Sequence, residues 1–465
     1  MSNQDSHTFE VTRGLLDRAS LTSFRFGEDT ALVAVQHMLL QTVDLFETAA
    51  AMGLDRTNMF ALGKVYSNSQ PVIEMLRDRG VTVIESTTPK LGEFDSSFER
   101  DVERLWQVAA KTLAHQNIKR ILVLDDDGVC IVNTPREVLD QYALCGVEQT
   151  SQGIFLFEDK PPPFAVVAWA RSAVKLQIGG PIFSHCFSEK LNTEFLGGKS
   201  IRGKQLGIIG MGSIGRALAK LAVRQGINVL FYDRVRDVNI SASLRDVIRC
   251  TDSLEELMIT SDYVAGCSGR SPFKNKWPLS HQPGIKLFSV STGDQEFGPI
   301  IDDLKGKPEF AVHPETWDIT SRHGPTGPIQ IAYLGYPYTF VSRTPEAVPT
   351  EIVQLETGGL LASLVHARIY LELCETRSSR LCRVSPKAQQ FVYETWLKAM
   401  KDRGVNIIET FGYDAELLAA TQHDDWFSQN SEPHEDELSE IDREVENRMA
   451  GFIGSNSRVT SREEE

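Results

Sequence analysis

The sequence predicts an α/β fold of two domains with a tail, and three observations favour it. A chain of 465 residues, of which 41% are hydrophobic, has enough apolar material for more than one core. Apolar runs of strand length alternate with helical segments, which is typical of parallel sheets covered by helices. Residues 210–215 read Gly-Met-Gly-Ser-Ile-Gly and lie between one such run and an amphipathic helix.

The first 30 residues are polar, and we expect them to be disordered. The region 31–190 is predicted to form the first α/β domain, with its longest helices over 31–53 and 96–115. Its strand candidates are 58–62, 81–84, 120–124, 153–157 and 164–168. Three consecutive prolines at 161–163 separate the last candidate from the one before it.

The glycine-rich motif belongs to a complete βαβ unit. A predicted strand at 206–209 precedes it, a helix at 216–224 follows, and a second strand at 229–232 ends on Asp233. Gly210, Gly212 and Gly215 permit a tight turn and close approach of a pyrophosphate to the helix N-terminus at Ser213 and Ile214. A carboxylate at the position of Asp233 accepts hydrogen bonds from an adenine ribose, which predicts NAD as cofactor.

Two alternatives remain open at this motif. A glycine turn between a strand and a helix forms without any ligand, and Arg234 and Arg236 leave NADP in competition with NAD. The predicted cofactor domain spans 195–348, with further strands at 263–265, 286–290, 309–312 and 338–341. Ser268 and Gly269 follow the first of these strands, and we expect them to be further cofactor contacts.

The C-terminal part is predicted to be helical over 349–420 and disordered over 424–465. Residues 424–465 hold 13 acidic and 4 basic side chains, so −9 of the net charge of −15 lies in this tail. The apolar cluster 449–453 is either a small docking motif or a chance grouping.

Composition excludes several classes of function. The rest of the chain carries a net charge of only −6 and shows no basic stripe, so nucleic acid is not an expected partner. No apolar run approaches the roughly 20 residues that span a bilayer, and the first residues do not resemble a signal peptide. The seven cysteines form no Cys-x-x-Cys pair, so we expect reduced thiols, a cytoplasmic location and no metal site.

The order of these segments resembles the adenosylhomocysteinase family. Four stretches carry the resemblance: 36–47, which begins Gln-His-Met, 124–128 (Leu-Asp-Asp-Asp-Gly), 146–153 (Gly-Val-Glu-Gln-Thr-Ser-Gln-Gly) and 172–175 (Ser-Ala-Val-Lys). The resemblance implies an NAD domain of Rossmann type inserted in a substrate domain, and a homo-oligomer of two or four subunits. It also implies that NAD oxidises a ribose hydroxyl before thiol elimination and water addition.

Three residues match the family's catalytic positions. The resemblance makes His37 the acid/base near the leaving group, places Asp126 at the mouth of a parallel sheet, and lets Lys175 contact the hydroxyl that is oxidised. The alternative for each is structural: a core histidine, a loop aspartate and a lysine that extends along a helix.

Departures from the family pattern change the expected activity. Family carboxylates fall on Gln149 and Gly179, a family histidine falls on Thr292, and a family threonine falls on Leu39. We therefore expect an enzyme that oxidises a secondary alcohol of a nucleoside- or sugar-like substrate, rather than authentic adenosylhomocysteine hydrolysis.

Two other hypotheses remain. One is a catalytically degenerate NAD-binding protein with a regulatory or scaffold role. The other is an oxidoreductase like the D-2-hydroxyacid dehydrogenases, which would use Arg270, Glu296 and either His313 or His323.

Overall fold

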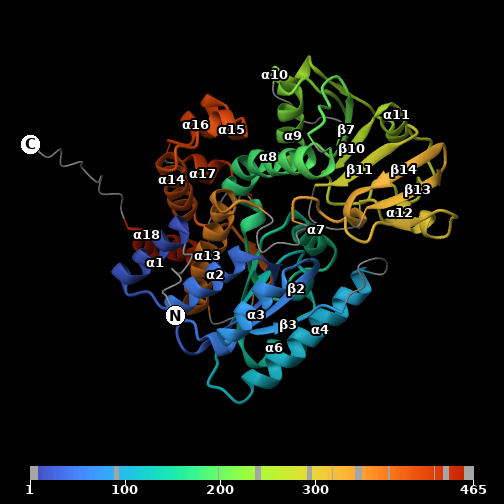
Figure 1. Cartoon of the computed structure of the whole chain (residues 1–465). Helices are drawn as coiled ribbons and strands as arrows, with labels where there is room; N and C mark the ends of the chain where they lie inside the picture. Colours follow the sequence, from blue (N-terminus) through green and yellow to red (C-terminus); the bar gives the residue numbers. More distant parts are fainter. Residues whose placement is uncertain are drawn as a thin grey trace, which may run out of the picture.

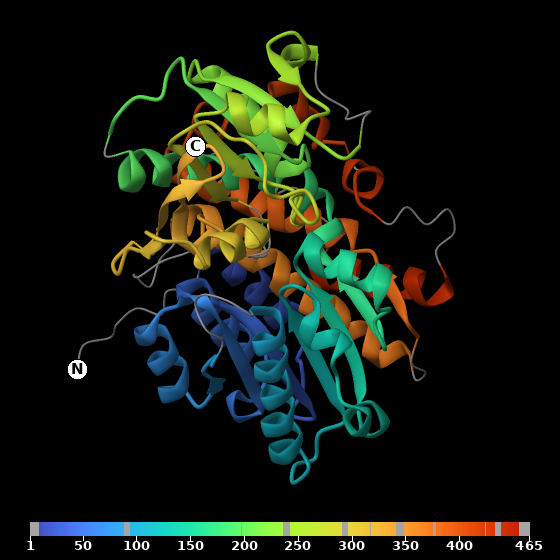
Figure 2. The ribbon, with the colours of Figure 1, turned by 90° about the vertical axis from the view of Figure 1, so that its right-hand side faces the viewer.

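The computed structural model describes residues 9–87, 94–196, 198–235, 242–290, 296–316, 318–340, 348–374, 378–423, 425–432 and 439–454. Figures 1 and 2 show two layered α/β units, one built mainly from the blue and cyan segments and the other from the green and yellow segments. Each unit has a central sheet with helices on its faces.

The first sheet has seven strands, all parallel, in the order β15-β6-β5-β4-β1-β2-β3. The order reverses between β1 and β4, so the carboxyl ends of these two strands flank a crevice. The strands are β1 (Thr30–Met38), β2 (Met59–Asn68), β3 (Thr82–Ile84), β4 (Arg120–Asp125), β5 (Ala143–Glu148), β6 (Ala165–Ala168) and β15 (Arg380–Cys382).

Helices bury both faces of this sheet. One face packs against α2 (Leu40–Ala51) and α13 (Thr350–Leu373), and the other packs against α4 (Phe94–Leu113). All nine residues of β1 are buried, as expected for a central parallel strand. The helices α3 (Gln70–Asp78), α5 (Val129–Val132), α6 (Arg136–Gln141), α7 (Ser151–Asp159) and α14 (Pro386–Asp402) complete this unit.

The second sheet has eight strands in the order β12-β13-β14-β11-β10-β7-β8-β9. Its parallel part follows the doubly wound order and reverses between β7 and β10, which places a second crevice there. The strands are β7 (Gln205–Ile209), β8 (Asn228–Tyr232), β9 (Ile248–Cys250), β10 (Tyr263–Gly266), β11 (Ile285–Ser289), β12 (Ala311–Val312), β13 (Ile319–Gly324) and β14 (Gly327–Ile331).

Helix α9 (Ser213–Arg224) covers one face of the second sheet, and α11 (Leu254–Thr260) and α12 (Gly298–Lys305) cover the other. The chain enters this unit through α8 (Gly180–Lys190), which crosses the middle of Figure 1, and returns to the first unit in α13. The predicted fold class is therefore confirmed: a Rossmann-type doubly wound unit is inserted in a second α/β unit.

Several predicted elements were wrong. The expected helix over 31–53 is β1 followed by α2, because a strand buried on both faces shows no alternation to distinguish it from a helix. The expected strand at 153–157 lies in α7, where Thr150 caps the helix by accepting a hydrogen bond from the Gly153 backbone at 3.0 Å. Strand β5 was not predicted, and the described part of 338–341 is a turn rather than a strand.

Both chain ends are more ordered than expected. Residues Glu10–Thr22 form α1, and the acidic segment contains α17 (Trp426–Gln429) and α18 (Glu440–Ile453). Helix α18 buries Val445, Met449, Phe452 and Ile453 against α1, α13 and α14, so the apolar cluster 449–453 docks on the chain's own core. Residues 1–8, 433–438 and 455–465 lie outside the described residues.

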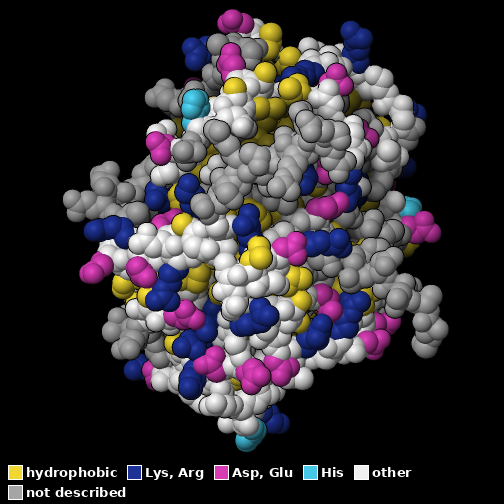
Figure 3. All heavy atoms as spheres, turned by 90° about the vertical axis from the view of Figure 1, so that its left-hand side faces the viewer, with side chains coloured by type: hydrophobic (Ala, Val, Ile, Leu, Met, Phe, Trp, Pro, Cys, Tyr) yellow, Lys and Arg dark blue, Asp and Glu magenta, His cyan; other side chains and the backbone are white. Residues whose placement is uncertain are grey.

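The surface carries charges of both signs. On the face in Figure 3, acidic and basic side chains are interspersed rather than gathered into one patch. None of the helices in the described part of the chain is both long enough and apolar enough to cross a bilayer. Short helices α10 (Ala242–Arg245), α15 (Ile407–Phe411) and α16 (Ala415–Ala420) lie at the periphery.

Candidate active site

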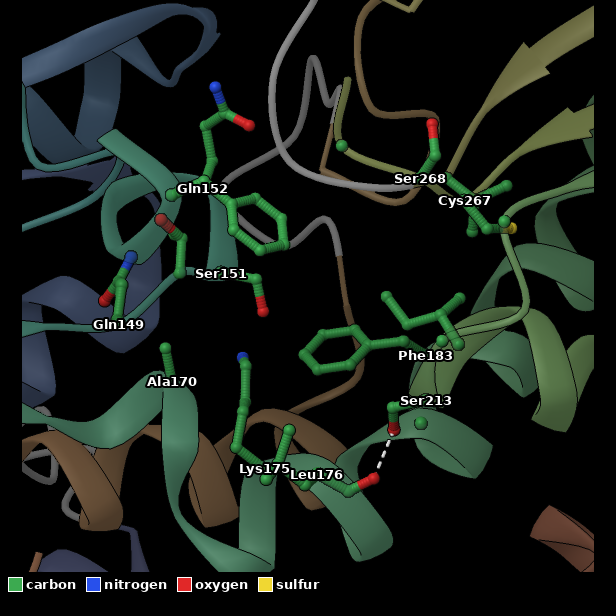
Figure 4. A pocket seen from close by; sticks show the side chains of 18 of the residues that line it. Gln149, Ser151, Gln152, Ala170, Lys175, Leu176, Phe183, Ser213, Cys267 and Ser268 are labelled. Atoms are coloured by element: carbon green, nitrogen blue, oxygen red, sulfur yellow. Dashed lines mark hydrogen bonds between the residues drawn. The ribbon is translucent and has the colours of Figure 1, made fainter. Parts of the chain in front are cut away.

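A cleft of about 770 Å³ lies between the two sheets, and both crevices open into it. The loops after β1 and β4 line it from the first unit, and the loops after β7 and β10 line it from the second. Figure 4 shows Lys175 pointing into this space, with Gln149 and Ser151 on one side and Phe183 and Ser213 on the other. A single cavity therefore joins the glycine-rich loop to the polar side chains of the first sheet.

The glycine-rich loop is shaped to receive a pyrophosphate. Gly210 adopts φ +92°, and a Cβ there would lie 2.7 Å from the Ser268 backbone. A Cβ at Gly215 would lie 2.0 Å from the Gly210 oxygen, whereas a Cβ at Gly212 would meet no described atom within 4 Å. The first and third glycines are required by the turn itself, while the second leaves open space in front of the α9 N-terminus. This space fits the pyrophosphate of a dinucleotide.

Asp233 lies at the end of β8, beside that loop. Its carboxylate accepts hydrogen bonds from the backbone nitrogens of Met211 at 2.6 Å and Val235 at 2.9 Å. These bonds fix the carboxylate at the rim of the cleft, where it can accept hydrogen bonds from a ribose diol.

Ser268 and Gly269 line the opposite side of the cofactor crevice. Glu296 accepts hydrogen bonds from both backbone nitrogens, at 2.6 and 3.3 Å, and from the Ser268 hydroxyl at 2.7 Å. Across the crevice, the hydroxyl of Ser213 donates to the Leu176 carbonyl at 2.6 Å. The cofactor loop is thereby hydrogen-bonded to the segment that carries Lys175.

His37 and Asp126 come together at the carboxyl edge of the first sheet. His37 lies near the end of strand β1 rather than on the predicted helix. Its Nε2 lies 3.2 Å from Asp126 Oδ2. Its Nδ1 lies 2.6 Å from the Ser67 hydroxyl, and Phe340 stacks on the ring at 4.4 Å. Both ring nitrogens therefore have partners that fix the imidazole plane toward the cleft.

Lys64 was not predicted as a site residue, yet it is fully buried beneath Asp126. Its Nζ donates to Asp126 Oδ1 at 2.6 Å and also pairs with Asp127. Burial alone would raise the pKa of Asp126, but the charges of Lys64 and His37 outweigh burial and hold this pKa well below its usual range. The ionised form of Asp126 is therefore favoured. A lysine in the middle of strand β2 shows no motif in the sequence, so only the tertiary structure identifies it.

Two further carboxyls lie behind this cluster. Burial raises the pKa of Asp125, and burial together with the charge of Asp125 raises the pKa of Glu148 well above its ordinary value. Gln149 instead faces the cleft and donates to Asp126, while its oxygen accepts from Gln36 at 3.0 Å. The Gln149 amide thus forms a hydrogen bond with Asp126, but it cannot take up a proton.

Lys175 lies on a π-helical segment, Val174–Gly179, at the junction of the two units. Its Nζ pairs with Glu356 Oε2 at 2.9 Å and lies 4.8 Å from the centre of the Phe183 ring. The Lys175 side chain is 27% exposed, so the ammonium is accessible from the cleft. Irregular π-helical turns of this kind are frequent at functional sites.

Two of the residues nominated for a hydroxyacid dehydrogenase site, Arg270 and Glu296, both bond to Ser268 at the edge of the cleft. Arg270 lines the cleft, stacks over Phe155 at 4.1 Å and pairs with Glu158 at 3.3 Å. Glu296 accepts a hydrogen bond from the backbone of Ser268. His313 is exposed, and its Nδ1 accepts hydrogen bonds from two backbone nitrogens. Thr292 and the side chain of His323 lie outside the described residues.

Comparison with known proteins identifies the cofactor domain. Residues 185–271 match the D-isomer specific 2-hydroxyacid dehydrogenase, NAD binding domain. The match includes the glycine-rich loop, Asp233 and the Ser268 loop. D-3-phosphoglycerate dehydrogenase 1 of Saccharomyces cerevisiae is 42% identical over 64 residues, which is 14% of this chain and 13% of the yeast protein. Glyoxylate reductase of Thermococcus gammatolerans is 39% identical over 67 residues, or 14% of this chain and 19% of that enzyme.

A match over a longer stretch of this chain is to a protein whose name gives no function. An uncharacterized protein of Mycobacterium tuberculosis (strain H37Rv) is 27% identical over 285 residues, which is 61% of this chain and 54% of that protein. This chain thus spans about half the length of that relative. The solved apo-structure of D-lactate dehydrogenase from Escherichia coli superposes with a TM-score of 0.29 at 13% identity, covering 59% of this chain and 78% of that one. Such a score is too low to indicate a shared overall fold.

These findings support a dehydrogenase-type cofactor domain and do not single out the adenosylhomocysteinase family. The chain contains an NAD-binding Rossmann domain like that of the D-isomer specific 2-hydroxyacid dehydrogenases, and NAD is its cofactor.

Proposed function

We propose that this protein is an NAD-dependent oxidoreductase, like the 2-hydroxyacid dehydrogenases, that interconverts a secondary alcohol and a ketone. The observation that carries this proposal is the single cleft that holds the glycine-rich loop and the His37, Asp126 and Lys175 side chains together. When NAD is bound, it supplies the hydride acceptor in this cleft. The residues of the first unit then bind the substrate and handle the proton.

The cofactor is held by Gly210, Gly212, Ser213, Ile214 and Gly215, with Asp233 on the adenine ribose and Ser268 and Gly269 on the opposite wall. The aromatic ring of Phe183 borders the space between this loop and Lys175. Lys175 donates hydrogen bonds to the substrate oxygen, and Asp126 orients His37 as a hydrogen-bonding partner for the rest of the substrate.

The first substrate class we propose is a 2-hydroxy acid, because the cofactor domain matches dehydrogenases of that class. Arg270 is the cleft residue suited to its carboxylate, since its pair with Glu158 is exposed and easily exchanged for a ligand.

A second candidate is a nucleoside- or sugar-like alcohol. Neutral amides and hydroxyls line the part of the cleft next to Asp126, and they suit a polyhydroxylated ligand better than a small acid. These residues are Gln36, Gln41, Gln149, Thr150, Ser151 and Gln152.

The test begins with mass spectrometry of cofactor released from the purified protein. Absorbance at 340 nm is then followed with two panels of substrates: lactate, glycerate and 2-hydroxyglutarate as both enantiomers, and adenosine, inosine, adenosylhomocysteine and ribose. Reduction of NAD by either panel supports the proposal and selects the substrate class. NAD that stays oxidised with every compound would refute it and favour the alternative of a non-catalytic NAD-binding protein.

Assembly and location belong to the same proposal. We infer a cytoplasmic homo-oligomer of two or four subunits, with a small molecule rather than nucleic acid or membrane as its ligand. Light scattering of the purified chain tests the assembly, and a monomer would contradict it.

A further inference from the structure

A second cavity, of about 420 Å³, lies beside the cofactor cleft. Its walls come from helix α9 of the inserted unit, from the π-helical segment that carries Lys175, and from residues 411–417 between α15 and α16. Helix α15 packs against α8, and Phe411 and Tyr413 belong to the core of the first unit (Figure 1). The cavity therefore touches both units, and its volume falls in the range of about 300–1,000 Å³ that is typical of small-molecule sites.

Three basic side chains follow one face of α9. Arg216, Lys220 and Arg224 are spaced four residues apart, so they lie above one another on the helix, and all three line this cavity. Among the described residues of the cavity wall, the acidic side chain is Asp414, which pairs with Lys220. The wall therefore carries an excess of two positive charges.

Arg216 is half-buried without a counter-ion. Within the described part of the chain, no carboxylate forms an ion pair with it, and its Nη1 donates to the Met211 carbonyl at 3.2 Å. Burial lowers the pKa of Arg216, and the charge of Asp233 offsets this effect only in part. A cation that is partly withdrawn from water in this way favours the binding of an anion.

Arg224 and Lys220 are accessible from solvent at the mouth of the cavity. A Cβ at Gly412 would lie 2.5 Å from Arg224 Nη1, so this exposed guanidinium lies against the opposite wall. Asp414, the partner of Lys220, has a side chain that is 61% exposed. Because exposed ion pairs contribute little to stability, an anionic ligand can take the place of the Asp414 carboxylate.

Apolar side chains form the rest of the wall, which suits a ligand with an organic body rather than a bare ion. They include Leu176, Pro181, Ala217, Leu221, Leu244 and Leu417.

A thin wall separates this cavity from the cofactor cleft. Leu176, Ser213 and Arg216 line both spaces, and the Ser213 hydroxyl donates to the Leu176 carbonyl at 2.6 Å between them. A ligand in the second cavity therefore leaves the space in front of the glycine-rich loop free for NAD.

We propose that the second cavity binds a small organic anion with two or more negative charges, either a phosphate ester or a polycarboxylate. Its anionic groups contact Arg216, Lys220 and Arg224, and they displace Asp414 from Lys220. The bound anion bridges α9 and residues 411–417, so it joins the inserted unit to the first unit and stabilises the folded protein.

The test is made on protein saturated with NADH, so that the cofactor crevice is already occupied. Isothermal titration calorimetry follows the binding of pyrophosphate, AMP and citrate, and each binding probe should also raise the unfolding temperature. Added salt should weaken the binding because it screens the charges. Tighter binding of pyrophosphate and AMP identifies a phosphate site, whereas tighter binding of citrate identifies a polycarboxylate site.

Two variants locate the bound anion. Arg224→Gln should weaken binding of the best probe about tenfold, because it removes a charged donor. Asp414→Asn should strengthen binding about threefold, because it removes the carboxylate that competes for Lys220. Both variants should keep wild-type NADH affinity, since neither residue lines the cofactor cleft.

Arg202→Gln is the matched control. Arg202 is an exposed arginine of the same unit that also lies against a glycine, Gly226, but it does not line the cavity. This variant removes the same charge and should bind the probe as wild type does.

Three outcomes would overturn the inference. The first is that no probe binds to the NADH-saturated wild type. The second is that Arg224→Gln binds the probe as tightly as wild type, which would place the anion elsewhere. The third is that Arg202→Gln weakens binding as much as Arg224→Gln, which would indicate a non-specific effect of net charge. None of these measurements uses turnover, so their outcome is independent of the proposed function.

Discussion

The variant Gly212→Ala tests whether the glycine-rich loop binds a cofactor or is only a tight turn. The backbone of Gly212 has φ −68° and ψ −161°, which alanine can adopt, and its added Cβ would meet no described atom within 4 Å. The cofactor-free variant should therefore unfold in urea like wild type or be more stable by about 0.4–1 kcal/mol, because alanine restricts the unfolded chain.

The same methyl group intrudes on the space reserved for the pyrophosphate. An overpacked contact costs about 1–3 kcal/mol, so the affinity for NADH, measured by its fluorescence, should fall about 10- to 100-fold. Gly306→Ala is the matched control, because a Cβ at this α12 C-cap also meets no described atom and lies away from the cleft. Unchanged NADH affinity in Gly212→Ala would refute the placement of the pyrophosphate, and a loss of stability would refute the steric reasoning.

Three further predictions concern charged side chains. Lys175→Ala should abolish NAD reduction while NAD stays bound, and wild-type turnover in this variant would remove Lys175 from the chemistry. Lys64→Met leaves Asp126 and Asp127 buried without their counter-ion, so urea unfolding should show a loss of about 3–5 kcal/mol, partly recovered by adding Asp127→Asn. Burial raises the pKa of Glu446 from 4.5 to about 7, so its contribution to stability is present at low pH and lost as pH rises through 7. Between pH 5 and pH 8, the free energy of unfolding of Glu446→Gln should therefore rise by up to about 3 kcal/mol relative to that of wild type. If the difference between the two proteins stayed constant over this pH range, this account would be contradicted.

The parts of the site that follow from local sequence could be predicted. The glycine-rich loop and Asp233 belong to one βαβ unit, so their spacing alone places them together at one sheet edge. His37 and Asp126 could be selected as a pair by resemblance, and the strand order explains why they meet at the reversal between β1 and β4.

The residues that tertiary packing places in the cleft wall or directly behind it could not be predicted. Lys64 is an isolated lysine in an apolar strand, and Glu356 is one of several acidic residues on a long helix. Their roles depend on which side chain each faces, and no periodicity encodes that. Helix α18 escaped prediction for a related reason: its few apolar residues suffice only because α1, α13 and α14 form a ready surface for them.

The return of the chain to the first sheet has a consequence for biosynthesis. Strand β15, which pairs with β6, and helix α13, which covers one face, emerge from the ribosome only after the whole nucleotide-binding unit. The inserted unit is contiguous in sequence and can fold while synthesis continues. Strands β1 to β6 are synthesised earlier, but the apolar sheet face that α13 covers stays exposed until α13 has been made. The nascent chain is therefore most exposed to aggregation in its N-terminal third, although those residues are made first.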